Sequence, residues 1–208
     1  MTIYLYSGTP GTGKSLHAAN EIRFQLNRRK PRPVIGNFAL SPLAPVRNDG
    51  WFWHYDNQDL TPDLLMDFAD DYWTNTNPNF REDHITLVLD ECQLLFNSRL
   101  WTAKDRLAWL EFFSQHRKFG YKVIFIAQSA KMVDNQFRML VEYEYMHRKV
   151  ANLGIIGTLV GALFLNRLYM HINYYFQTSE RLGMDWFVAS NKDFAMYDTH
   201  ARFERTAR

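Results

Sequence analysis

The segment from Gly8 to Ser15 reads Gly-Thr-Pro-Gly-Thr-Gly-Lys-Ser, which matches the phosphate-binding pattern G-x-x-x-x-G-K-[ST] at every fixed position. In such a loop the glycines let backbone N–H groups turn inward around an anion, and the lysine reaches the β- and γ-phosphates. The serine hydroxyl is a ligand for Mg²⁺. The sequence therefore predicts a site for ATP and Mg²⁺ that is built from Gly8, Thr9, Pro10, Gly11, Thr12, Gly13, Lys14, Ser15 and Leu16.

Two carboxylates, Asp90 and Glu91, directly follow the apolar run Ile85 to Leu89. An aspartate in this position is typical of a Walker-B residue that holds the Mg²⁺ shell, and the glutamate next to it can orient the attacking water. The alternative is a pair of solvated carboxylates at a strand end. Together with the phosphate-binding loop, the pair predicts hydrolysis of ATP, with Ser15 and Asp90 at the metal and Glu91 as the catalytic carboxylate.

Phosphoryl transfer also uses groups that sense or neutralise the γ-phosphate. Gln128 follows the apolar run Lys122 to Ala127 and is a candidate for sensing the γ-phosphate. An ordinary polar residue that ends the strand is an equal alternative. Arg99, Arg117 and Arg138 are candidates for an arginine finger, each with a surface ion pair as the alternative. Arg117 is the preferred candidate because its helix leads into the strand that carries Gln128.

The elements that must position these residues alternate between strand and helix. Apolar and β-branched runs predict strands at 2–7, 33–38, 85–89 and 122–127. Helical spacing predicts helices after Lys14, from Thr61 to about Trp73, and from Thr102 to Gly120 with a core face formed by Ala103, Leu107, Leu110 and Phe113. This order predicts an α/β P-loop NTPase fold, with a mostly parallel central sheet flanked by helices.

Ligands of such sheets bind at the carboxyl ends of the strands, and loop 8–15, Asp90-Glu91 and Gln128 all follow predicted strands. We therefore expect these groups to meet at one edge. The alternation fades after Lys149, so residues 1–149 are predicted to form the ATPase core and residues 150–208 a small C-terminal extension packed on it.

Composition narrows the functional classes. The 208 residues include 24 basic and 22 acidic side chains, so contact with a polyanion must be local. The single cysteine, Cys92, fits a reducing compartment and a packing role, and the scattered histidines lack metal-binding spacing. The N-terminal segment has no signal-peptide pattern. A secreted or surface-acting effector and a small-molecule kinase are therefore weaker alternatives.

Two segments have no assignment in this scheme. The uncharged run 153–165 is too short for a bilayer-spanning helix and is interpreted as a buried or partner-facing element, with membrane contact as the alternative. The basic run Arg28 to Arg32 ends a predicted helix. A solvated helix end explains the run, and contact with a DNA backbone or with anionic lipid is the alternative.

The motifs between residues 88 and 138 resemble the zonular occludens toxin (Zot) family, and within it the gene I assembly proteins of filamentous phages. The resemblance is carried by Val88-Leu-Asp-Glu-Cys92, Phe96-Asn-Ser-Arg99, Trp101, Arg117-Lys-Phe-Gly120, Val123 to Gln128, Val133-Asp134, Gln136 and Arg138, and by Met196-Tyr-Asp-Thr199 near the end. Residues 150–185 match poorly.

The resemblance implies the cytoplasmic domain of an ATPase at the host inner membrane that drives assembly and extrusion of the phage. It further implies a homo-oligomer, with a ring as the expected form, that works with channel and coat proteins and has a membrane anchor after the cytoplasmic domain. Contact with phage single-stranded DNA or with its binding protein is a further implied possibility. The alternative within the P-loop class is an ATPase that translocates single-stranded DNA directly.

Overall fold

The computed structural model describes residues 2–96 and 103–196. Its centre is one eight-stranded sheet with the order β3-β2-β4-β5-β1-β6-β7-β8. In this spatial order, the neighbouring strands from β3 through β2, β4, β5 and β1 to β6 pair in parallel. The pairs β6-β7 and β7-β8 are antiparallel. The strands are β1 (Ile3–Ser7), β2 (Val34–Gly36), β3 (Phe52–His54), β4 (Ile85–Leu89), β5 (Tyr121–Ile126), β6 (Tyr143–Lys149), β7 (Leu168–Tyr175) and β8 (Glu180–Val188).

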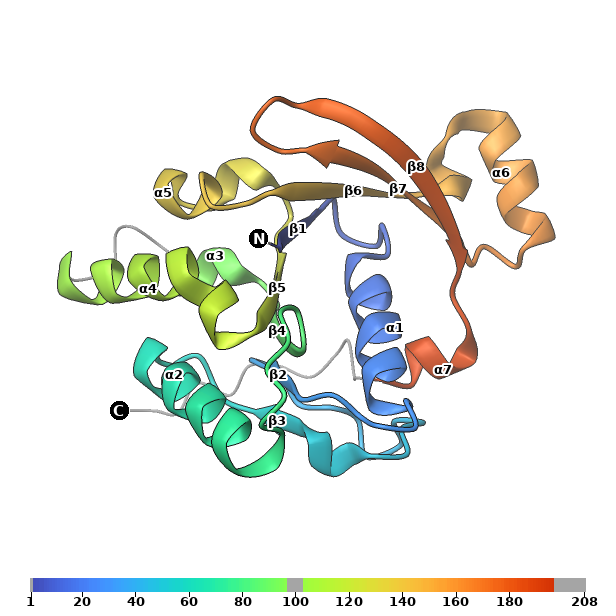
Figure 1. The fold of residues 1–208 in the computed structure, drawn as a ribbon. Coiled ribbons are helices and arrows are strands. Elements are labelled where there is room, and N and C mark those ends of the chain that lie inside the picture. The colour runs from blue at the N-terminus through green and yellow to red at the C-terminus, as the bar shows by residue number, and fades with distance from the viewer. Residues whose placement is uncertain (1, 97–102, 197–208) are drawn as a thin grey trace, which may run out of the picture.

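Helices cover both faces of the parallel part of the sheet (Figure 1). Helix α1 packs on one face, where its Ala18, Ala19 and Ile22 meet Tyr6 of β1 and Ile124 of β5. Helices α2, α3, α4 and α5 cover the other face. The helices are α1 (Lys14–Leu26), α2 (Pro62–Asp71), α3 (Cys92–Leu95), α4 (Ala103–Gln115), α5 (Asn135–Arg138), α6 (Gly154–Leu163) and α7 (Asn191–Phe194). The α/β P-loop fold predicted from the sequence is confirmed.

Helix α2 begins as its sequence predicts. The Thr61 hydroxyl caps the helix by accepting a 3.2 Å hydrogen bond from the Leu64 N–H, and Pro62 occupies the first turn. The predicted core face of α4 is partly wrong, because the side chain of Leu107 is 56% exposed. Phe113 is buried as predicted, and Trp109 and Phe112 form the buried face with it in place of Leu107.

The described part of the segment 150–208 continues the central sheet. Strand β7 pairs with β6, so this segment adds strands to the same sheet, and the division after Lys149 stays a prediction. Helix α6 lies between β6 and β7 and projects from the molecule (Figure 1). Its apolar side chains are largely exposed, with Ile155 at 83% and Ile156 at 78%, so the expectation of a buried element is wrong and a contact surface remains.

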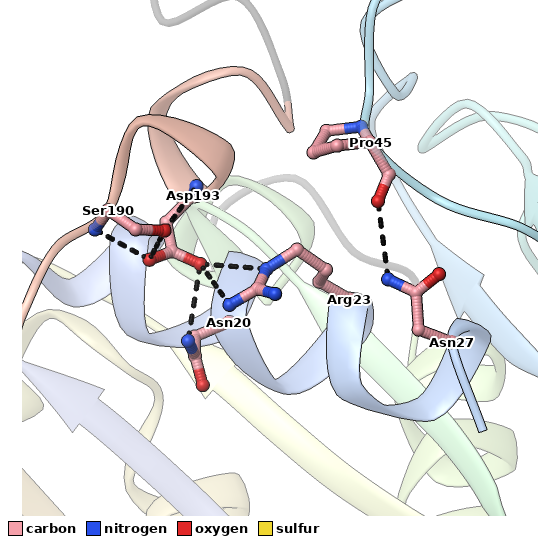
Figure 2. Close-up of polar contacts among 6 residues, drawn as sticks. All are labelled: Asn20, Arg23, Asn27, Pro45, Ser190 and Asp193. Carbon is pink, nitrogen blue, oxygen red and sulfur yellow. Dashed lines mark hydrogen bonds and ion pairs between the residues drawn. The ribbon is translucent and has the colours of Figure 1, made fainter.

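Helix α7 returns the chain to α1, and a buried carboxylate joins the two helices (Figure 2). Asp193 closes a capping box with Ser190 and accepts hydrogen bonds from Asn20 and Arg23 at 3.2 and 3.0 Å. At the end of α1, the Asn27 side chain donates to the Pro45 carbonyl oxygen at 3.2 Å. The middle and the C-terminal end of α1, which follows the phosphate-binding loop, are therefore fixed by distant segments.

Candidate nucleotide site

The loop between β1 and α1 is shaped by glycines and by a wall of β6 and β7. Gly13 has φ 94°, and a Cβ atom there would lie 2.5 Å from Cδ1 of Tyr169 on β7. A side chain at this position would be strained both by its backbone and by its surroundings. Because Gly13 has no side chain, the loop backbone can lie against Tyr169 with its N–H groups free to face an anion at the start of α1.

Lys14 places its ammonium group across the loop. Its Nζ donates to the carbonyl oxygens of Gly8 at 2.7 Å and Thr9 at 3.1 Å, and the residue is 8% exposed. Burial lowers the pKa of Lys14, while the charges of Glu91 and Asp90 oppose that shift. The cation, the loop and both predicted carboxylates therefore occupy one site.

Asp90 and Ser15, the predicted metal pair, lie in contact. Burial raises the pKa of Asp90 to about 6, against opposing effects from hydrogen bonds with the Glu91 N–H and the Ser15 hydroxyl and from the charge of Lys14. A half-buried carboxylate beside a hydroxyl gains stability from a divalent cation, because the cation offsets the lost hydration. The pair therefore fits Mg²⁺, with Asp90 and Ser15 as the residues that would hold it.

Glu91 has a strained backbone at the start of α3. Its φ of 46° and ψ of 43° place a non-glycine residue in the left-handed region, a conformation that costs free energy and is concentrated at functional sites. The Gln93 side chain donates a hydrogen bond to the Glu91 carboxylate. Backbone and side-chain contacts together hold this carboxylate at the carboxyl end of β4.

Gln128 follows β5, which lies between β4 and β1 in the sheet. Its backbone carbonyl accepts a 3.3 Å hydrogen bond from the Gly8 N–H, and its side chain is exposed. The structure thus brings together the loop, Asp90-Glu91 and Gln128, as the sequence analysis expects.

Arg117 lies at the opposite edge of the sheet. It stands in the turn His116–Phe119 at the amino end of β5, and its Nε is 2.5 Å from the Glu82 carboxylate. The reason for preferring Arg117 is therefore wrong: a helix that leads into a parallel strand enters at the amino end, away from the nucleotide edge. Arg138 bonds Asn135 at 2.6 Å, and Arg99 lies outside the described residues.

Asn37 is a site residue that the sequence analysis missed. It is 2% exposed, and its side chain accepts from the Asp90 N–H at 2.7 Å and donates to the Asp90 carbonyl at 2.8 Å. These two bonds fix the backbone of Asp90. Its position could have indicated this role, because Asn37 is a polar residue directly after the apolar strand β2, at the same edge of the sheet.

This fold and this loop define the class of the protein as a P-loop NTPase. More narrowly, the chain belongs to the zonular occludens toxin (Zot) family, whose sequence model matches residues 2–167.

The chain is also similar to individual proteins. The gene 1 protein of Salmonella phage IKe is 36% identical over an alignment of 220 positions, which covers 98% of this chain and 58% of that protein. The N-terminal domain of zonular occludens toxin from Neisseria meningitidis has a TM-score of 0.58 at 16% identity, with 95% of this chain and 98% of that chain covered. The DNA-packaging ATPase B204 from Sulfolobus turreted icosahedral virus has a TM-score of 0.55 at 14% identity, with coverages of 89% and 96%.

The matched region is only part of the phage relatives. The chain spans between 34% and 60% of the length of the gene 1 proteins that it matches.

Proposed function

We propose that this chain hydrolyses ATP and supplies the energy for assembly and extrusion of a filamentous phage through the host inner membrane. The observation that supports hydrolysis is the convergence of Lys14, the Ser15–Asp90 pair and Glu91 on one sheet edge. Membership of the Zot family and similarity to phage gene 1 proteins support the role in assembly.

Each residue of the site has a distinct task in this proposal. The loop backbone and Lys14 bind the β- and γ-phosphates, and Leu16 lies in the first turn of α1 behind them. Ser15 and Asp90 hold Mg²⁺, which when bound neutralises charge on the phosphates. Glu91 orients the attacking water and accepts its proton, and Gln128 contacts the γ-phosphate from the end of β5.

The substitution Glu91→Gln tests hydrolysis. It keeps the shape of the side chain but removes the proton acceptor, so we expect ATP binding to remain while turnover falls by about 10²- to 10⁴-fold. A fluorescent ATP analogue measures binding, and phosphate release measures turnover. Glu111→Gln, on the exposed side of α4, is the matched control. Normal turnover in the Glu91 variant would remove this residue from the mechanism.

A second experiment separates assembly from hydrolysis. Lys14→Ala in the intact gene should abolish the release of filamentous virions, because the loop loses its phosphate-binding cation. The exposed Lys118→Ala removes the same charge elsewhere and should leave the titre unchanged. An undiminished phage titre with Lys14→Ala would refute the assembly role.

We further propose that the protein works as a homo-oligomeric ring beside channel and coat proteins of the phage. Arg117 lies at the sheet edge opposite the nucleotide loop, so it cannot serve its own site. A head-to-tail ring brings unlike surfaces of neighbouring subunits together, which is the arrangement that a finger from this edge requires.

We also propose that α6 and its flanking residues contact the surface of the host inner membrane. The term α6 surface denotes seven exposed apolar residues: Leu153, Ile155, Ile156, Leu159, Leu163, Phe164 and Leu165. None of the helices that the structure describes has both the length and the apolar composition needed to cross a bilayer. The segment 145–179 contains Arg148, Lys149 and Arg167 but no carboxylate, so its charge complements anionic headgroups.

Vesicle flotation tests this contact. The wild-type chain should float with vesicles that contain phosphatidylglycerol, and a triple variant with Ile155, Ile156 and Leu159 changed to asparagine should not. The matched control changes three other exposed apolar residues, Leu43, Leu107 and Met139, to asparagine. If the α6 surface instead joins two copies, the triple variant will have a lower molar mass than the wild type at the same concentration, and vesicle binding by the wild type will be absent.

A further inference from the structure

A basic cavity of about 520 Å³ lies at the sheet edge opposite the nucleotide loop. It stands at the amino ends of β2 and β4, since Arg32 precedes β2 and His84 precedes β4. Five cationic side chains line this basic cavity: Arg28, Arg29, Lys30, Arg32 and Arg81.

The described part of the chain does not pair these cations with carboxylates. Within residues 2–96 and 103–196, no ion pair joins any of the five to a carboxylate. The pKa of Arg32 is lowered, first by burial and then by repulsion from Arg28 and Arg81. Such a cluster of like charges lowers the stability of the folded chain until an anion binds there.

His84 adds an unpaired polar atom to the wall. Burial and the charges of Arg32, Arg81 and Arg28 lower the pKa of His84 to about 4, so the ring is neutral at physiological pH. Its Nε2 is 3.0 Å from the Tyr72 hydroxyl, and its buried Nδ1 has no hydrogen-bond partner in the described part of the chain.

A second cavity of about 250 Å³ adjoins the basic cavity and has aromatic walls. The two cavities share Trp51, Tyr72 and Thr76. In this aromatic cavity Trp51 and Trp53 stand edge to face with ring centroids 6.4 Å apart. Aromatic rings beside a basic groove are the combination that binds single-stranded nucleic acid, since bases stack on the rings and phosphates meet the cations.

The backbone between the two cavities has an unusual geometry. Residues Tyr72–Thr76 form a π-helical turn, closed by a 2.9 Å hydrogen bond from the Asn77 N–H to the Tyr72 carbonyl oxygen. Turns of this kind are rare and are frequently found at functional sites. This one places Tyr72, Thr76 and Asn77 in the wall of the basic cavity.

We infer that these two cavities bind a segment of single-stranded nucleic acid, with its phosphodiesters on the basic side chains and a base against the partly buried ring of Trp51. The polar side chains of Thr76, Asn77 and Asn79 favour this ligand over a lipid, because they hydrogen-bond base edges and offer nothing to an acyl chain. The inference gives the proposed motor a polymer to handle, and in that sense it rests on the proposed function.

Fluorescence anisotropy with a labelled oligothymidylate of about 16 nucleotides, titrated with the full chain in the absence of ATP, tests the site directly. Arg29 and Arg81 are both exposed, so Arg29→Gln with Arg81→Gln should leave the fold intact. We expect this double variant to bind about tenfold more weakly. We also expect the slope of log K against log salt to fall by about 1.4, since each lost phosphate contact contributes about 0.7.

The matched control replaces two exposed cations outside the cavity, Arg181→Gln with Lys192→Gln, and should bind as the wild type does. Trp51→Ala should weaken binding about tenfold with little change in the salt slope, because stacking is lost and charge is not. Melting curves of every variant report whether the fold is retained.

Several results would overturn the inference. These are no binding by the wild type, equal loss in the matched control, equal affinity for duplex DNA, or full competition by thymidine monophosphate. The chain could also bind anionic vesicles through Arg29 and Arg81 without binding the oligonucleotide. That result would show that the site binds lipid headgroups. ATP hydrolysis without oligonucleotide binding refutes this inference alone, whereas oligonucleotide binding without hydrolysis refutes only the proposed ATPase.

Discussion

At the scale of single residues, Asp90 is a carboxyl group placed where the folded protein disfavours its charge. Burial raises its pKa from the ordinary 3.8 to about 6. The folded chain therefore holds this proton more tightly than the unfolded chain does. Stability is lost as the pH rises from about 4 to about 6, and the loss persists above that window. Bound Mg²⁺ would remove this cost, which couples metal binding to stability.

This coupling predicts the behaviour of Asp90→Asn. Above pH 6 the nucleotide-free variant should be more stable than the wild type by about 1 to 2 kcal/mol, and the difference should vanish below pH 4. Urea denaturation between pH 4 and 8 measures it. Asp70→Asn, on the exposed side of α2, is the control. A variant less stable than the wild type at pH 8 would contradict the prediction.

The sequence predicts some of these residues and not others, for a physical reason. Gly8 to Ser15 and Asp90-Glu91 are contiguous motifs whose types and order suffice to indicate their chemistry. Asn37 acts on Asp90 across the pairing of β2 with β4, and Tyr169 approaches Gly13 from β7. Such partners depend on strand order and register, which one chain read in isolation does not specify.

At the scale of elements, α7 is a four-residue helix whose position depends on one buried carboxylate, Asp193 (Figure 2). Asp193 is 3% exposed and forms an ion pair with Arg23 at 3.0 Å. Hydrogen bonds from Ser190 and Asn20 and the charge of Arg23 lower the pKa of Asp193, and together they outweigh the opposing effect of burial. The carboxylate therefore stabilises the fold above its ordinary pKa of 3.8, and that contribution is lost as the pH falls through the lower pKa of the folded state.

Asp193→Ala should lower the free energy of unfolding by about 2 to 4 kcal/mol at pH 7, because Arg23 loses its buried partner and α7 loses its cap. The difference from the wild type should shrink as the pH falls below 3.8, where the wild-type carboxylate takes up its proton. Urea denaturation at both pH values measures the effect. Lys192→Ala, on the exposed side of α7, should change little. An equal loss for the two variants would show that Asp193 has no special role.

Elements whose sequence contains one dominant pattern were predictable, and elements with two competing apolar patterns were not. Helix α2 begins at a capping threonine followed by proline, which leaves little alternative. In α4 the spacing of Leu107 and Leu110 competes with that of Trp109 and Phe112, and Phe113 fits both patterns. The aromatic rings are buried because they bring more apolar area into contact with β5. There the ring centroids of Phe113 and Phe125 are 5.1 Å apart. The three-residue strand β3 is too short to show a period.

At the scale of the whole molecule, the two edges of the sheet carry different chemistry. The carboxyl edge holds the nucleotide loop and its carboxylates, whereas the amino edge holds the basic cavity and Arg117. A ring in which the amino edge of one subunit meets the carboxyl edge of the next would place Arg117 against a neighbour's nucleotide. In this geometry one subunit contributes the arginine finger and its neighbour contributes the nucleotide, so the arrangement can be tested by mixing variants.

Arg117→Ala subunits retain every group of the nucleotide loop but lack the proposed finger, while Lys14→Ala subunits retain Arg117 and lack the phosphate-binding cation. Each variant alone should hydrolyse ATP slowly, by a factor of about 10³ if the arginine acts as fingers do elsewhere. A mixture of the two should regain activity, because a Lys14→Ala subunit offers its Arg117 to the intact loop of an Arg117→Ala neighbour. Phosphate release measured across mixing ratios should therefore pass through a maximum near equal amounts.

The same mixture with Arg138→Ala in place of Arg117→Ala is the control. If Arg138 has no role in turnover, that variant is active alone and mixing with Lys14→Ala only dilutes it. A linear decline for the Arg117→Ala mixture as well would show that Arg117 acts only in its ion pair with Glu82. Because the maximum requires two different subunits at one nucleotide, its appearance would establish the shared site and the contact between unlike edges in a single measurement.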